Sequence, residues 1–129
     1  MASGPGVQRA KDALDMWLAG GGTIRLWKVA PAFDGTGGTE SVPAGGAPTV
    51  SFQPAVAGTG GQIAKAQSGP VTFSGVADAS SAIVALSVHD PSDNSVIALD
   101  AAWTAPGAGW SSGDSPQLAY VSVPFVPVS

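Results

Sequence analysis

The chain has 129 residues, a formal net charge of −4 at pH 7 and only 11% charged residues. Nucleic acids and anionic membranes select clustered Lys and Arg, so this composition argues against both as partners. The chain has no cysteine, which excludes disulfides, thiolate nucleophiles and cysteine-ligated metals. The length fits one domain, and 18 Gly and 11 Pro indicate many turns between short strands.

The first 29 residues carry the one expected helix and the first expected strand. Residues 1–6 (MASGPG) are expected to form a flexible arm, and residues 1–11 have no apolar signal-peptide core. A helix is predicted over about residues 7–19, which ends at three glycines, residues 20–22. Its apolar stripe places five side chains on one face, and Trp17 is therefore expected in the core: Val7, Ala10, Leu14, Trp17 and Leu18.

The rest of the chain predicts short strands separated by turns and by two long loops, residues 30–48 and 104–117. No apolar run is long enough to span a bilayer. The strand at 82–90 is apolar on both faces and is expected at the centre of a sheet. Pro124 and Pro127 place the last strand at an edge. The expected strands are residues 23–29, 49–54, 61–69, 70–76, 82–90, 96–100 and 118–128.

These elements predict a mainly β fold for residues 1–129. The number and spacing of the strands are typical of a single β-sandwich, jelly-roll or immunoglobulin-like, with one short N-terminal helix.

The single histidine, His89, is the strongest candidate for catalysis. A hydrolase would use it as a base beside Asp90 or Asp93, with Ser87 or Ser92 as the nucleophile. Adjacent strand residues point to opposite faces, so His89 and Asp90 do not form a ready pair. No GxSxG nucleophile elbow occurs in the chain. We therefore interpret His89 as a residue at the end of a strand and predict that the protein is not an enzyme.

Neither a metal nor a cofactor is predicted. Asp90, Asp93 and Asn94 lie close together, but the EF-hand pattern is absent, and Asp and Asn at a turn bind backbone amides themselves. The two GTGG segments, residues 35–38 and 58–61, lack the Lys and Ser or Thr of a phosphate-binding loop.

Charge is unevenly distributed along the chain. Residues 1–28 carry four basic and two acidic side chains, whereas residues 66–129 carry five Asp and no base. Such asymmetry suits contacts between copies or with a partner. Trp103 and Trp110 flank a Gly-rich loop, where an exposed indole contacts a partner protein or a glycan, or else pins the loop to the core.

The order of these segments resembles small β-sandwich virion proteins of tailed bacteriophages. The resemblance rests on a helix that ends in Gly (RAKDALDMWLAGG), the strand TIRLWKV, a hairpin from Val88 to Leu99, and a Gly113–Asp114 turn into the last strand. It covers residues 8–128. It implies a structural role in the particle, without catalytic residues or a cofactor.

The resemblance implies a capsid decoration or minor capsid protein on the outer shell of a virion assembled in the host cytoplasm. Its partners would be the major capsid protein or other virion proteins, and it would form a homo-oligomer, with a trimer favoured. A tail or collar component, or a receptor- or carbohydrate-binding module, is the alternative. The expected docking residues are Arg9, Lys11, Trp17, Arg25 and Lys28, with Trp103 and Trp110 as further contacts on exposed loops.

Overall fold

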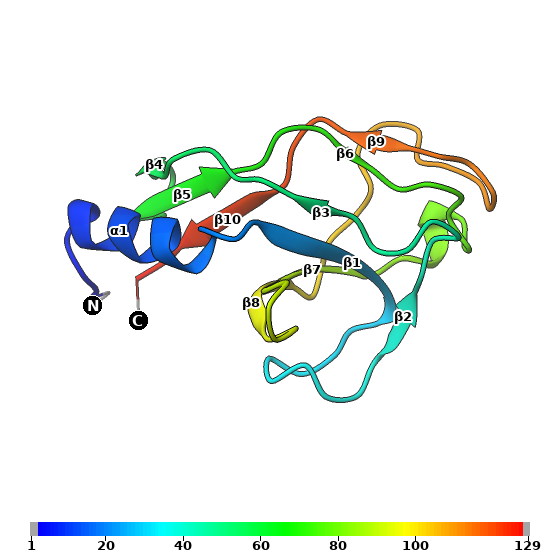
Figure 1. The fold of residues 1–129 in the computed structure, drawn as a ribbon, viewed down its shortest axis with the longest axis horizontal. Helices are drawn as coiled ribbons and strands as arrows, with labels where there is room; N and C mark the ends of the chain where they lie inside the picture. Colours follow the sequence, from blue (N-terminus) through cyan, green and yellow to red (C-terminus); the bar gives the residue numbers. More distant parts are fainter. Residues whose placement is uncertain (1–2, 128–129) are drawn as a thin grey trace.

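A computed structural model describes residues 3–127, and in that part of the chain one α-helix precedes ten short strands (Figure 1). The elements are α1 (Val7–Trp17), β1 (Gly22–Val29), β2 (Thr39–Ser41), β3 (Thr49–Val50), β4 (Val56–Ala57), β5 (Ala64–Gln67), β6 (Val71–Thr72), the 3-10 helix η1 (Ser80–Ala82), β7 (Ala85–His89), β8 (Val96–Asp100), β9 (Gln117–Leu118) and β10 (Ser122–Phe125).

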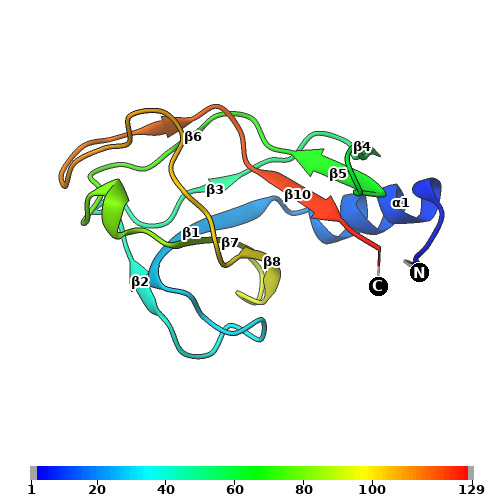
Figure 2. The ribbon, with the colours of Figure 1, turned by 180° about the vertical axis from the view of Figure 1, so that it is seen from behind.

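The strands form two layers, which confirms a mainly β sandwich with one N-terminal helix. One layer is a sheet in the order β2-β1-β7-β8, with β3 also paired to β1. The other contains the sheet β10-β5-β4 and the pair β6-β9. Every strand pair is antiparallel. The two layers can be followed from the front in Figure 1 and from behind in Figure 2. The strand β7 lies between β1 and β8, so the predicted central position is confirmed.

The core lies between the layers and is closed at one end by α1. Phe73 and Val71 from one layer and Ile24 and Val88 from the other are almost completely buried. The helix packs against β5 and buries three side chains of its apolar stripe, Ala10, Leu14 and Leu18. In β5 alternate residues are buried, whereas all five residues of β7 are buried.

The connection from α1 to β1 depends on two glycines. The helix ends at Trp17, two residues before the predicted end, and the Leu18 N–H donates to the Leu14 carbonyl at 3.0 Å. Gly21 has φ +82°, a conformation that glycine adopts without steric cost. A Cβ at Gly22 would lie 2.5 Å from Val88 Cγ1, so only glycine allows β1 to approach β7 this closely.

Several features differ from the sequence prediction. The expected loop 30–48 contains β2, which pairs with β1 through Leu26 opposite Ser41. The two-residue strand β4 was not predicted. The central strand begins at Ala85 rather than at residue 82, and Val84 lies outside it and is exposed. Strands this short depend on their tertiary partner rather than on local propensity.

The first and last described segments lie side by side at one end of the molecule. Of the expected arm, residues 1 and 2 lie outside the described residues, as does residue 128 of the expected last strand. Gly4 lies against Ile63 and Pro127. The last strand is split into β9 and β10, and β10 pairs with β5 alone, so the predicted edge position of Pro124 is confirmed.

The core assignment predicts different outcomes for two phenylalanines. Phe73 is 0% exposed and Phe33 is 77% exposed. We expect Phe73→Ala to lower the free energy of unfolding by about 3–5 kcal/mol, because it leaves a cavity. The matched variant Phe33→Ala is expected to change it by less than about 0.5 kcal/mol. Urea denaturation of both variants measures this, and equal effects would contradict the assignment.

Candidate functional site

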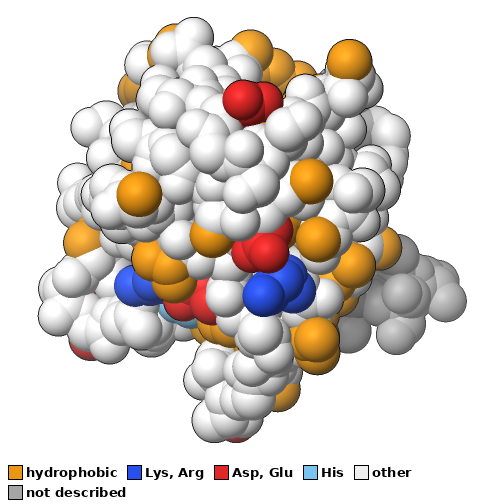
Figure 3. Space-filling view, turned by 90° about the vertical axis from the view of Figure 1, so that its right-hand side faces the viewer, with side chains coloured by type: hydrophobic (Ala, Val, Ile, Leu, Met, Phe, Trp, Pro, Cys, Tyr) orange, Lys and Arg blue, Asp and Glu red, His pale blue; other side chains and the backbone are white. Residues whose placement is uncertain are grey.

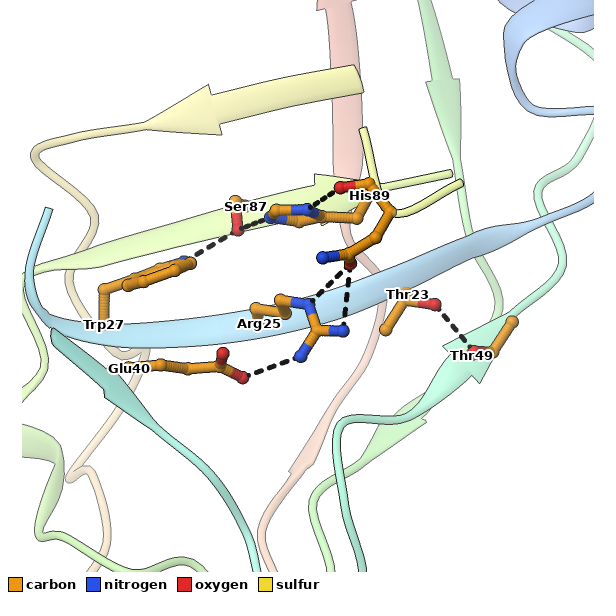
Figure 4. Close-up of polar contacts among 8 residues, drawn as sticks. Thr23, Arg25, Trp27, Glu40, Thr49, Ser87 and His89 are labelled. Carbon is orange, nitrogen blue, oxygen red and sulfur yellow. Dashed lines mark hydrogen bonds and ion pairs between the residues drawn. The ribbon is translucent and has the colours of Figure 1, made fainter. Parts of the chain in front are cut away.

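A chain of hydrogen bonds crosses the outer face of the five-stranded sheet and contains the only histidine (Figure 4). Trp27 Nε1 donates to Ser87 Oγ at 2.8 Å, and Ser87 Oγ lies 2.7 Å from His89 Nε2. His89 Nδ1 lies 3.0 Å from the Asn94 carbonyl oxygen, which can only accept. Nδ1 therefore carries the proton, and Ser87 donates its own proton to Nε2.

Asn94 extends this chain to the edge of the sheet. Its Oδ1 accepts from Arg25 Nε at 3.2 Å and from Nη2 at 3.0 Å. Arg25 Nη1 donates to Glu40 Oε2 on β2 at 2.9 Å. Asn94 has φ +62°, which Asn tolerates better than most residues. The network thus ties β1, β2, β7 and the β7–β8 turn together.

The buried position of this network determines its chemistry. Ser87 is 0% exposed and His89 is 3% exposed. The indole of Trp27 stacks on the imidazole of His89, with 6.3 Å between the ring centroids. Ser87 therefore contacts His89, as a serine hydrolase would require, but no substrate carbonyl can reach its Oγ in this conformation. The network is built to support the sheet, and the prediction of a strand-end role for His89 agrees with its position as the last residue of β7.

The acidic residues that follow His89 accept hydrogen bonds within their own turns. Asp90 accepts from the Ser92 N–H and hydroxyl, and Asp93 accepts in the same way from Ser95. These hydrogen bonds from Ser95 hold the pKa of Asp93 below its usual value. Thr36 lowers the pKa of Asp34 in the same manner. Over residues 3–127, acidic and histidine side chains nowhere gather in threes as a metal site would need.

The expected docking residues do not form one basic surface. Arg9 and Lys11 lie on α1 beside Asp12 and Asp15, at one end of the molecule (Figure 1). Lys28 lies at the far end of β1. Arg9 and Lys11 therefore lie on a different element from Arg25 and Lys28, and the docking role of these residues stays a prediction.

Two of the expected docking residues, both on β1, already have acidic partners within the fold. Lys28 Nζ lies 3.8 Å from Asp78 Oδ2, and Arg25 is held by Glu40. On the end of the molecule seen in Figure 3, basic side chains lie directly beside acidic ones. The charge asymmetry of the sequence is thus largely cancelled in space at these positions.

Trp17 is not in the core, which corrects the expectation from the helical stripe. It is 42% exposed, and its indole stacks on Phe125 with 5.5 Å between centroids. The helix ends at this residue, and the buried stripe passes instead through Leu14 and Leu18. Trp17 also borders a hollow with Asp90 and Ile97, beside the turn that Arg25 contacts.

Trp103 and Trp110 are half-buried rather than exposed at a loop tip. Trp110 Nε1 donates to the Asp78 carbonyl at 3.1 Å, and its ring stacks on Phe73 at 6.4 Å. Trp103 lies 6.2 Å from Trp110 between ring centroids. The two indoles pin the loop 104–117 to the core, and Trp103 keeps one surface in a hollow.

A groove lies between β8 and β10. It has a volume of about 690 Å³ and continues into a second hollow of about 390 Å³, which shares Leu86, Asp100 and Ser122 with it. Sequence analysis missed it because its walls come from distant segments. The available signal was the strand VIALD, which is apolar and lacks both Pro and a basic residue.

Comparisons with known proteins found no match, either among protein-family models or among curated proteins or solved structures. Among the described residues 3–127, no helix has the length and apolar character needed to cross a membrane.

The buried network predicts that Ser87 matters more than an exposed serine. Ser87→Ala leaves the Trp27 N–H and His89 Nε2 without partners, and we expect a loss of about 2–4 kcal/mol in the free energy of unfolding. Ser81 is exposed, and Ser81→Ala should change it by less than about 0.5 kcal/mol. Chemical denaturation of both variants provides the measurement. Similar values for the two would show that the network does not stabilise the sheet.

The turn at Asp93 predicts a measurable titration. Its folded-state pKa is lowered, so its charge stabilises the fold above the ordinary Asp pKa, and this contribution disappears as the pH falls through the lowered value. In Ser95→Ala the pKa of Asp93 should move back up toward its usual value. Carboxyl-detected NMR titration measures both, with Asp34 as the internal control, and an unchanged Asp93 pKa in Ser95→Ala would refute the assignment.

Proposed function

We propose that this protein is a non-enzymatic structural component of a tailed-phage virion, bound to the outer shell as a decoration or minor capsid protein. The proposal rests on the resemblance of residues 8–128 to small β-sandwich virion proteins. Its partners would be the major capsid protein or other virion proteins, and it would act as a homo-oligomer, with a trimer favoured.

One observation carries the structural role: the Trp27–Ser87–His89 chain is buried and saturated with hydrogen bonds. The residues that would serve chemistry in an enzyme are used here to join strands. Without disulfides, such buried polar links together with the Trp110 contact would support a domain that must persist outside a cell.

Trp103 favours a second candidate, a carbohydrate- or receptor-binding module. It lines the smaller hollow together with Tyr120 and Asp100. Aromatic faces beside a carboxylate suit the apolar face and hydroxyls of a sugar. In that case Trp103→Ala would abolish binding to host cells or glycans and leave the amount of protein on the particle unchanged.

Copy number on purified particles tests the main proposal. We expect one copy per shell subunit, or one per few, by quantitative mass spectrometry against the major shell protein. A few copies per particle would instead indicate a tail or collar component. Absence from particles would refute a virion role.

Charge variants test the docking residues if residues that form ion pairs within the fold are changed separately from those on α1. The double variant Arg9→Glu/Lys11→Glu changes side chains on α1 and should reduce the copy number with little change in unfolding free energy. Arg25→Glu instead breaks the contacts with Glu40 and Asn94 and should destabilise the fold itself. Normal incorporation of the α1 double variant would exclude Arg9 and Lys11 from docking.

A further inference from the structure

The strand β8 has an unprotected edge, unlike the other sheet edges in residues 3–127. It pairs only with β7, and its five residues include neither Pro nor Lys nor Arg. The edge strand β10 contains Pro124, and β2, β3 and β4 have three residues or fewer. Natural sheets protect their edges with short strands, prolines or charges, so an unprotected edge marks a place where another strand can pair.

The register shows which backbone groups β8 presents. The Trp27 carbonyl accepts from the Val84 N–H, so the backbone groups of Trp27 point toward β7. This direction alternates along a strand, so the backbone groups of Arg25 also point toward β7, and Arg25 lies opposite Ser87. Ser87 therefore directs its backbone groups toward β1. Leu99, which lies opposite Ser87 on the other side, directs its N–H and carbonyl away from β7, toward the open edge.

The groove beside this edge is apolar. Its floor includes Leu86 and Val88, and its far wall includes Pro124 and Val126. Phe33, which is exposed, borders it as well. Side chains of an added strand would thus contact the core of the sandwich along the open side between β8 and β10.

Charge and aromatic rings indicate what the occupant carries. Asp100 is the one charged residue that lines the groove or its continuation among the described residues, and no Lys or Arg lines either. Asp90 borders the neighbouring hollow beside Trp17. At the Asp100 end, Trp103 and Tyr120 lie in the same hollow. A carboxylate next to aromatic rings favours an ammonium or guanidinium group.

We propose that the groove binds an extended segment of a partner protein, which pairs antiparallel with β8 and places a Lys or Arg side chain at Asp100, Trp103 and Tyr120. Because Asp100 lies opposite Leu86, it is on the groove face of β8. Backbone hydrogen bonds to Leu99 would supply affinity, and the groove would select apolar residues at alternate positions, with a basic residue on the same face at the acidic end. The inference does not depend on a virion role, since it follows from the edge, the groove and the charge.

A labelled peptide with Val at alternate positions and one Lys at the last position of the same face (the Val/Lys peptide) tests the proposal. The matched probe has Glu in place of that Lys (the Val/Glu peptide). We expect saturable binding of the first peptide only, measured by fluorescence anisotropy, with slower amide exchange at Leu99 in NMR. Asp100→Asn keeps the oxygen that accepts from the Ala102 N–H but removes the charge, and should weaken binding about fivefold. Leu99→Pro removes the outward N–H and should abolish binding.

Asp114→Asn is the control variant, because Asp114 accepts a similar loop hydrogen bond away from the groove, and it should bind like the native protein. The proposal is overturned if the Val/Lys peptide does not bind, if the Val/Glu peptide binds equally, or if Asp100→Asn and Asp114→Asn have the same effect. A dimer of the protein that forms through β8 in analytical ultracentrifugation would also overturn it, since a second copy would then occupy the edge. Because Asp100→Asn leaves the backbone intact, misfolding of Leu99→Pro would not prevent a decision.

Discussion

The hydrogen bond between Ser87 and His89 lies at the centre of the contacts that fix the five-stranded sheet. On one side it joins Trp27, and on the other it reaches Asn94 and, through Arg25, the short strand β2. Removing one buried partner would leave others without hydrogen bonds, so the links support one another. In a chain with no disulfide, the register of β1 against β7 depends on these side chains as well as on the core.

Periodic segments were predictable because their pattern is local. The stripe of α1, the alternation in β1 and the apolar run in β7 each specify an element without reference to the rest of the chain. The strands β2 and β4 have three and two residues, which is too short to leave a pattern. The position of β2 depends on its pairing with β1 and on the contact between Arg25 and Glu40. Residues 39–41 alone do not reveal either contact.

The candidate site was predictable only in part. The sequence analysis named Ser87 as a possible nucleophile, but its geometric argument used only the neighbours His89 and Asp90. The informative spacing was two residues, since Ser87 and His89 share one face of β7. The partner Trp27 lies 60 residues away in the chain, and its contact appears only once β1 and β7 are paired. Trp17 was misassigned because a stripe does not reveal where the helix ends.

Gly4 and Pro127 are neighbours, although nearly the whole described chain separates them. Both lie beside α1, far from the loop that contains Trp110 (Figure 1). A domain fused before Gly4 and one fused after Pro127 would therefore leave the sandwich from the same end, with the groove and the Trp110 loop outside their attachment points. A short linker could also join these ends and open the chain at a surface turn, so the order of segments could be permuted while the same strands remain paired.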